Sequence, residues 1–364
     1  MAKVTIAELA GILDAEYAGR GDLEIVAATE PAQAGVNDLA LAMDASYGSS
    51  LARSKARAAV LWEGADWQDM GLLSAIFVTR PRLAMSGITG VFAPTPEIQM
   101  GIHPSAVVDP TAEIGENVAI GPLTSIGPRA RIGENSRIMG QVTICEDVTI
   151  GTDALIHSGC RIGSGVVIGD RFIAHFNAVI GSDGFSFVTP EPGTAEEARL
   201  HFETSGGSPR QAYRRIASTA SVRIGDDVEV GANATIDKGT VADTVVGRGT
   251  KMDDQTHIGH NARVGEDCLM CGHSGVSGSV VLGDGVVMGG QSGVSDHVIV
   301  GDDVIVAGAT AILSNVPKGR VMMGYPAMQM KQNIEAYKAL RRLPRLMKKI
   351  DELAKQVLPP SRKT

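Results

Sequence analysis

The residue in this sequence that is best able to do chemistry is a histidine in the stretch MDDQTHIGHNARVGEDC, residues 252–268. His260 follows Gly259 in the step IGHN, within a run that otherwise favours small residues. An imidazole can take up or release a proton near pH 7, so His260 is a candidate general base. A single histidine is more often structural, and spacing alone leaves both interpretations open.

An aliphatic residue recurs at every sixth position around this stretch. The series runs from Val108 to Ile180, interrupted only by Ala174, and again from Val246 to Ile312. A period of six fits neither an α-helix nor a simple strand. It is typical of a hexapeptide solenoid, in which three sides of six residues close each coil. The pattern resembles the left-handed parallel β-helix of the hexapeptide acyltransferase superfamily, and it predicts a mainly β fold with about nine coils.

Segments without this period flank the solenoid and interrupt it. Residues 1–97 contain the strand patterns RAAVLW and SAIFVT, with a helix expected over YGSSLARSKA between them, which predicts a small α/β domain. The β-helix is expected over residues 98–325, with an excursion at 182–221. A helical tail follows over 326–364, and Pro344 should kink or split its helix.

Composition and charge narrow the classes of protein. Hydrophobic residues make up 44% and charged residues 20% of the chain, as in a globular protein. A net charge of -8 argues against a nucleic-acid partner. The sequence has no apolar run long enough to span a membrane and no signal peptide, and its four cysteines form no disulfide framework. We therefore expect a cytoplasmic protein.

The period of the coil places two further residues close to His260. Gly278 should lie one coil above it, about 4.8 Å along the axis, where its backbone N–H could face a developing oxyanion. His297 should lie on the same face, about 10 Å along the rod. These three residues outline a groove for an extended substrate.

The expected fold also bears on the oligomeric state. A bare rod has no deep cleft, and rods of this type typically trimerise, so we expect a homotrimer.

The longer motifs resemble one family of that superfamily, the UDP-3-O-acylglucosamine N-acyltransferases of lipid A biosynthesis. TIDKG followed by IGHN at this separation is the most specific feature. The matching stretches cover nearly the whole chain: VIGSDGFSF (179–187), VRIGDDVEVGANATIDKGTVADTVVG (222–247), MDDQTHIGHNARVGE (252–266), VSGSVVLGDGVVMGGQSGVSDHVIVGD (276–302) and MGYPA (323–327).

The resemblance implies a reaction and roles for individual residues. His260 would be the general base, taking a proton from the glucosamine 2-amine as it attacks the thioester of a 3-hydroxyacyl–acyl carrier protein. The family's upstream aspartate corresponds to Asp253 and its second, substrate-binding histidine to His297. Seven residues exceed one side of the coil, so Asp253 could meet His260 only across a subunit interface. No cofactor is implied beyond the phosphopantetheine thioester of the co-substrate.

The stretch NDLALAMDASYGSSLARSKARAAVL, residues 37–61, resembles the small uridine-binding domain of the family. In the family step F-L-x-N-x-x-Y, an aromatic ring and a tyrosine sandwich the uracil, and an asparagine hydrogen-bonds to it. The corresponding substrate-binding positions here are Leu41, Asp44 and Tyr47. Only the tyrosine is retained, so stacking would be one-sided, and Asp44 cannot donate as an amide does.

The tail and three rival interpretations complete the predictions. Residues 331–357 carry eight Lys or Arg and three Asp or Glu, which indicates either a solvated helix face or a docking surface for the acidic carrier protein.

The rival interpretations of function differ from the sequence in specific ways. A sister O-acyltransferase would lack the N-terminal domain. A γ-class carbonic anhydrase would need three zinc-ligating histidines, commonly with a His-x4-His pair that this sequence lacks, so no metal site is predicted. A purely structural solenoid would not explain the excursion.

Overall fold

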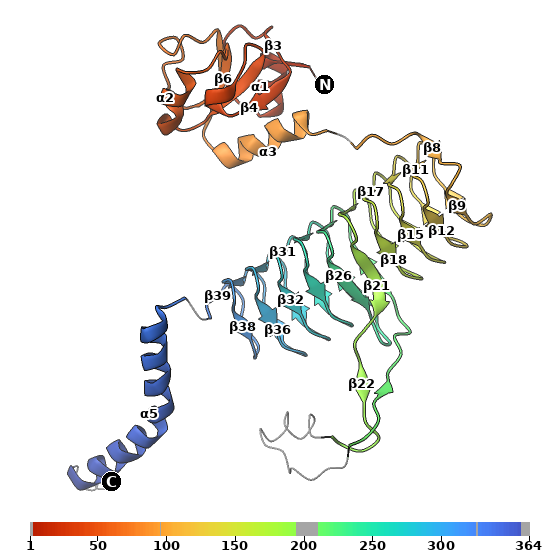
Figure 1. Cartoon of the computed structure of the whole chain (residues 1–364), viewed down its shortest axis with the longest axis vertical. Coiled ribbons are helices and arrows are strands. Elements are labelled where there is room, and N and C mark those ends of the chain that lie inside the picture. The colour runs from red at the N-terminus through yellow and green to blue at the C-terminus, as the bar shows by residue number, and fades with distance from the viewer. Residues whose placement is uncertain (1–2, 95, 194–209, 325–326, 358–364) are drawn as a thin grey trace. The chain divides into compact units, whose positions relative to one another are not determined.

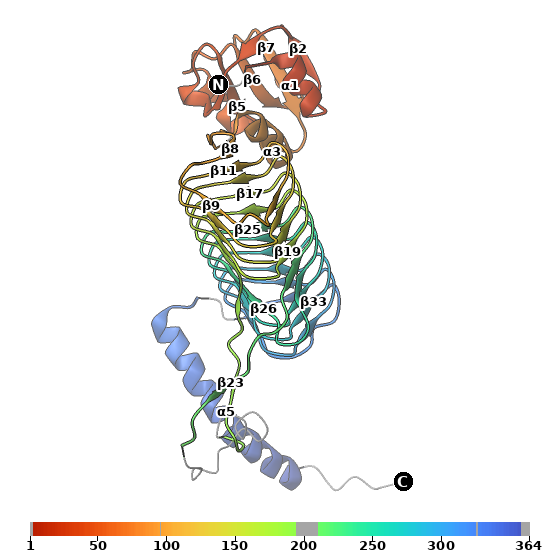
Figure 2. The same cartoon turned by 90° about the vertical axis from the view of Figure 1, so that its right-hand side faces the viewer.

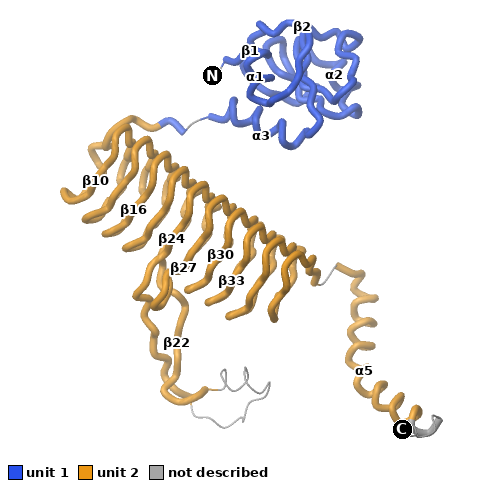
Figure 3. The backbone as a smooth tube through the Cα atoms, turned by 180° about the vertical axis from the view of Figure 1, so that it is seen from behind, with its two compact units in different colours: residues 1–97 blue, residues 98–364 orange. Residues whose placement is uncertain are grey.

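The computed structural model describes residues 3–94, 96–193, 210–324 and 327–357. The chain divides into two compact units, residues 1–97 and residues 98–364 (Figure 3). The first unit mixes helices and strands, and the second contains a β-solenoid and a long helix. The prediction of a mainly β protein with a left-handed parallel β-helix, a small α/β domain and a helical tail is therefore confirmed.

The N-terminal unit is built around a five-stranded sheet in the order β2-β7-β6-β5-β4. Strands β4 to β7 are parallel and β2 is antiparallel; α1 and α3 pack on one face of the sheet and α2 on the other. The predicted helix over residues 47–56 shrinks to one turn because glycine and serine are poor helix formers. The elements are β1 (Val4–Thr5), α1 (Ile6–Ile12), β2 (Tyr17–Gly19), β3 (Glu24–Ile25), β4 (Ala27–Thr29), η1 (Pro31–Gln33), β5 (Asp38–Ala42), η2 (Ala45–Tyr47), α2 (Gly48–Leu51), β6 (Ala58–Trp62), β7 (Ser74–Val78) and α3 (Pro81–Phe92).

The solenoid has three flat faces, each a parallel sheet, and its coils stack in register (Figures 1 and 2). The nine-strand face contains β10 (Glu113–Ile114), β13 (Arg131–Ile132), β16 (Thr149–Ile150), β19 (Val167–Ile168), β24 (Val222–Ile224), β27 (Thr244–Val246), β30 (Arg263–Val264), β33 (Val281–Leu282) and β36 (Ile299–Val300). The ten-strand face contains β9 (Val107–Val108), β12 (Ser125–Ile126), β15 (Thr143–Ile144), β18 (Arg161–Ile162), β21 (Val179–Asp183), β26 (Thr235–Lys238), β29 (His257–Ile258), β32 (Gly275–Val276), β35 (Gly293–Val294) and β38 (Ala311–Ile312). The eleven-strand face contains β8 (Gly101–Ile102), β11 (Ala119–Ile120), β14 (Arg137–Ile138), β17 (Leu155–Ile156), β20 (Ile173–Ala174), β25 (Glu229–Val230), β28 (Lys251–Met252), β31 (Leu269–Met270), β34 (Val287–Met288), β37 (Ile305–Val306) and β39 (Val321–Met322).

The aliphatic residue of each hexad points into the prism and forms its core. At the corner after every strand of the nine-strand face, the next residue is glycine. A Cβ atom on Gly115 would lie 2.7 Å from the backbone nitrogen of Glu134 in the next coil. The corner is glycine because the backbone of the neighbouring coil occupies the space of a side chain.

The excursion predicted at residues 182–221 leaves the ten-strand face at the end of β21. Its described part forms an antiparallel hairpin of β22 (Phe187–Val188) and β23 (Arg214–Arg215), and the chain rejoins the nine-strand face at β24.

The described part of the C-terminal segment forms a single helix, α5 (Met330–Val357), which continues through Pro344. Of the two predicted outcomes, Pro344 therefore does not split the helix, while Figure 1 shows the helix bent along its length, as a kink would make it. Proline removes one hydrogen-bond donor, but long helical stretches on both sides of Pro344 retain theirs. Across the described part of the chain, no helix is long and apolar enough to cross a membrane.

Two histidines one coil apart stack on a corner of the solenoid. The rings of His157 and His175 are 5.4 Å apart and nearly parallel at 7°. His175 Nε2 lies 2.8 Å from Glu229 Oε1. Burial, and secondarily the charge of His175, lower the pKa of His157 below its ordinary value.

We predict that His157 makes the fold less stable in acid. Because its pKa is lower in the folded chain than in the unfolded chain, the unfolded chain binds more protons as the pH falls through about 6.5. Acidification from about pH 7.5 to 5.5 should therefore lower the free energy of unfolding more in the native protein than in His157→Gln. Urea unfolding at both pH values measures this, and equal losses in the two proteins would contradict it.

Candidate active site around His260

His260 lies at the corner that follows β29 on the ten-strand face, with its ring held between two glycines. A Cβ atom on Gly184, at the start of the excursion, would lie 2.6 Å from the Cβ of His260. A Cβ atom on Gly278, in the next coil, would lie 2.7 Å from the ring carbon Cε1. Both positions need glycine, because any side chain there would collide with the imidazole.

A hydrogen-bond network fixes the tautomer of this ring. His260 Nδ1 lies 3.0 Å from Asn261 Oδ1. The Asn261 amide is oriented by its Nδ2, which donates to the carbonyl of Ala242 at 2.8 Å, and by Thr240 N–H, which donates to Oδ1 at 3.1 Å. Since Asn261 Oδ1 can only accept, the neutral imidazole carries its proton on Nδ1. Nε2 is left with a lone pair, as a general base requires.

The corner backbone around the ring offers a donor. Gly278 N–H makes no hydrogen bond within the described residues, whereas the neighbouring Ser279 N–H donates to the carbonyl of His260 at 2.9 Å. Asn261 itself adopts φ 62°, a left-handed conformation that asparagine tolerates better than most residues. The tight corner therefore brings the His260 imidazole and an unused backbone N–H side by side.

Two cavities meet at His260. One, of about 630 Å³, runs along the ten-strand face. Its floor is what we call the small-residue trough: the outward-facing positions His257, Gly275, Gly293 and Ala311, paired strand to strand in register. Leu313, 78% exposed, lies at its far end. A thin, extended apolar chain fits such a trough.

The second cavity, of about 700 Å³, lies between His260 and the hairpin of the excursion, and we call it the hairpin cavity. Phe185, Phe187 and Tyr213 line it from the excursion, and His297 from the rod. The Phe185 and Phe187 rings meet edge to face at 5.1 Å, and the Arg215 guanidinium lies 4.7 Å from the centre of the Phe187 ring. Sequence reasoning did not identify these aromatics. Since aromatic residues make up only 4% of the chain, their clustering in the excursion is a signal that could have found them.

A carboxylate–imidazole pair also lines the cavity along the ten-strand face, and the sequence interpretation gave it no role. Asp237 of the TIDKG motif is 6% exposed, and its Oδ2 lies 3.1 Å from His257 Nε2. Ser182 Oγ donates to its Oδ1 at 2.7 Å. The hydrogen bond to Asp237 raises the pKa of His257 above its ordinary value, against the opposing effect of burial.

The predicted residues around His260 separate into two groups. Gly278 and His297 line cavities with it, but Asp253 does not. Asp253 lies at the other corner, after β28, where its carboxylate accepts from Gly272 N–H and from Asp254 N–H, both at 2.8 Å. The distance along the chain therefore keeps Asp253 away from His260 of its own subunit, and pairing across an interface stays a prediction.

The predicted uracil-binding positions lie at the carboxyl end of β5 in the N-terminal unit. Leu41 packs partly into the core, and Tyr47 is 48% exposed. The Asp44 carboxylate caps η2 by accepting from Ser46 Oγ at 2.6 Å and from Ser46 N–H at 2.9 Å. These hydrogen bonds, the side-chain one first, hold the pKa of Asp44 below its usual range.

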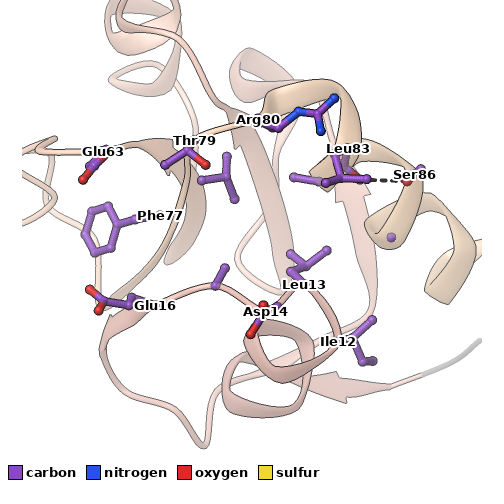
Figure 4. A pocket seen from close by; sticks show the side chains of 14 residues that line it. Ile12, Leu13, Asp14, Glu16, Glu63, Phe77, Thr79, Arg80, Leu83 and Ser86 are labelled. Atoms are coloured by element: carbon purple, nitrogen blue, oxygen red, sulfur yellow. Dashed lines mark hydrogen bonds between the residues drawn. The ribbon is translucent and has the colours of Figure 1, made fainter.

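A cavity of about 570 Å³ in the same unit does not include these three positions (Figure 4). It lies between the loop after α1 and the start of α3, with Phe77, Glu63 and Arg80 among its lining residues. No group of three or more metal-ligating side chains comes together in the described ranges.

Comparisons with known proteins agree with this geometry. The family described as GMPPB C-terminal domain matches residues 98–184, in the first part of the solenoid. The chain is also similar to a solved structure of UDP-N-acetylglucosamine acyltransferase from Arabidopsis, with a TM-score of 0.52, 22% identity, and coverage of 61% of this chain and 71% of that one. That likeness supports the fold alone.

Two relatives are much more similar in sequence. The UDP-3-O-acylglucosamine N-acyltransferase of Ruegeria pomeroyi is 61% identical over 98% of both chains. The protein of the same name from Paracoccus denitrificans is 61% identical over 97% of both. With that identity over nearly its whole length, the chain belongs to the UDP-3-O-acylglucosamine N-acyltransferase family.

Proposed function

We propose that the protein transfers a 3-hydroxyacyl chain from acyl carrier protein to the 2-amine of UDP-3-O-acylglucosamine, a step of lipid A biosynthesis in the cytoplasm. The names of the relatives support the acceptor and the reaction type. The observation that carries the chemistry is the Asn261 contact, which leaves Nε2 of His260 free to accept a proton.

The reaction is an acyl transfer from sulfur to nitrogen. The acceptor amine attacks the thioester carbon, and His260 Nε2 takes a proton from the nitrogen as the carbon–nitrogen bond forms. The oxygen of the tetrahedral intermediate gains negative charge, which the free N–H of Gly278 is placed to stabilise. The carbon–sulfur bond then breaks, and the imidazolium returns its proton to the departing thiolate. No cofactor is needed beyond the phosphopantetheine of the donor.

The two cavities suggest where the substrates lie. The small-residue trough suits the acyl chain of the donor, because beyond His257 its floor is backbone and small side chains. The hairpin cavity, with His297 on its wall, suits groups of the acceptor around the amine. We assign the uridine to the exposed ring of Tyr47 and the neighbouring positions Leu41 and Asp44.

The donor is carried by an acidic protein, and α5 offers a basic surface. Arg341, Arg342 and Arg345 are exposed and form no ion pair with any described residue. Unpaired guanidinium groups are available to an incoming acidic protein. We propose that this helix binds acyl carrier protein.

We predict that His260→Ala lowers kcat by about 10²–10⁴-fold, the usual contribution of a positioned base. The side chain lies outside the packed core, so the free energy of unfolding should change by no more than about 0.5 kcal/mol. KM for both substrates should stay nearly constant, because the ring acts on a proton and does not bind either substrate.

His103→Ala is the matched control for this experiment. His103 lies in the first coil and hydrogen-bonds only locally, with Nδ1 2.9 Å from Ser105 Oγ. Its replacement should leave kcat unchanged. A stable His260→Ala protein with a normal kcat would instead move the search for the base to His297.

We predict that changing Arg341, Arg342 and Arg345 to Glu raises KM for the acyl carrier protein while the unfolding temperature stays unchanged. The three reversals replace attraction by repulsion at the docking helix, and the difference from the native protein should shrink as salt is added. Steady-state kinetics at low and high ionic strength measure this. If KM is unchanged at both ionic strengths, the three arginines belong to a solvent-exposed helix face and do not bind the carrier protein.

We also predict that the active protein is a homotrimer, since the trough and the hairpin cavity of one rod leave the substrates open on one side. A neighbouring subunit would close them, and only there could its Asp253 approach His260. Light scattering combined with an activity assay tests this, and a fully active monomer would refute it.

A further inference from the structure

The mechanism above makes no use of the pair formed by Asp237 and His257, although both residues line the cavity that contains His260. The pair is well fixed. The Asp237 carboxylate is buried and is satisfied by Ser182 Oγ at 2.7 Å and by His257 Nε2 at 3.1 Å. A buried carboxylate destabilises the fold unless it accepts hydrogen bonds. Rotating the His257 ring away from Asp237 would remove one of these bonds, so the ring is held in place.

Because Nε2 of His257 is hydrogen-bonded to Asp237, Nδ1 is the ring nitrogen that is available to a ligand in the cavity. His257 is about half exposed, with 53% of its side chain accessible, and its Nδ1 has no hydrogen bond within the described ranges. In the neutral ring, Nε2–H donates to Asp237 and Nδ1 is an acceptor. In the imidazolium, Nδ1–H is a donor.

This dual behaviour selects the chemical class of ligand. A carbonyl would match only the protonated ring, and an ammonium group only the neutral one. A hydroxyl can donate to Nδ1 in one state and accept from it in the other. A hydroxyl is therefore the group that stays hydrogen-bonded to Nδ1 in either protonation state of the ring.

The position of His257 narrows the choice of hydroxyl. It is the first residue of the small-residue trough and lies in the same coil as His260. The next outward positions, Gly275, Gly293 and Ala311, offer no side-chain polar atom. A chain lying in the trough would therefore pass the His257 imidazole within a few bonds of the carbon at which the amine attacks.

We propose that His257, held by Asp237, recognises the 3-hydroxyl group of the donor acyl chain and so determines that hydroxylated chains are preferred. The inference rests on the proposed function and deepens it. The carbon that carries this hydroxyl is two bonds from the thioester carbon. With the thioester at His260, that carbon would lie at the first position of the trough, beside His257. Asp237 acts through His257 and is a positioning residue.

The test compares two donors of equal length on acyl carrier protein, one 3-hydroxylated and one unsubstituted, with the same acceptor. The native protein should prefer the hydroxylated donor in kcat/KM. His257→Leu should reduce this preference by at least about tenfold, because it lowers kcat/KM for the hydroxylated donor far more than for the unsubstituted one. His257→Gln, which keeps a donor and an acceptor at a similar reach, should restore most of the preference.

Thr235→Val is the matched control, since Thr235 faces outward one coil before His257 but does not line the cavity. It should keep the native preference. The unfolding temperature of each variant, with activity on the unsubstituted donor, shows whether the site is intact.

The other outcomes overturn the inference in distinguishable ways. If His257→Leu slows both donors equally, the residue serves the acceptor or the fold and does not recognise the hydroxyl. A native protein that transfers both chains equally well would refute hydroxyl recognition and leave the acyltransfer intact. If the native protein acylates the amine from neither donor, the proposed function itself fails, and the inference fails with it.

Discussion

The parallel backbone hydrogen bonds between coils are the constraint on which the rest of the structure depends. They tie each residue to the one 18 positions further along wherever the repeat is unbroken, as in the pairing of His257 with Gly275 and of Gly275 with Gly293. The same register forces Gly278 against the His260 ring and aligns the small-residue trough. One repeated hydrogen-bond pattern thus fixes the core, the corners and the floor of the active site.

The active site is built where this repeat is interrupted. The excursion separates the paired residues Val179 and Thr235 by 56 positions, and its first residues bring Gly184 against one side of the His260 ring. A shorter insertion separates Val222 from Thr244 by 22 positions, and it supplies the Thr240 N–H and Ala242 carbonyl that orient Asn261. The regular coils provide rigidity, and the two insertions provide the groups that hold the His260 ring.

This division explains what the sequence could predict. Features set by the six-residue period could be predicted from the sequence. These are the β-helix, the position of Gly278 and His297 near His260, and the separation of Asp253 from His260. The Asp237–His257 pair and the Asn261 contact depend on side-chain rotamers, which a period does not specify. The hairpin aromatics lie in an insertion with no period at all. Pro344 does not split its helix, because a helix of this length tolerates the loss of one hydrogen bond.

Two histidines three residues apart acquire different chemistry from the acceptors they face. His260 meets a neutral amide oxygen, which fixes its tautomer without adding a charge, so the ring stays suited to taking a proton. His257 meets a buried carboxylate, which raises its pKa and favours the imidazolium. The two imidazoles therefore leave different nitrogens free toward the same cavity, Nε2 of His260 and Nδ1 of His257.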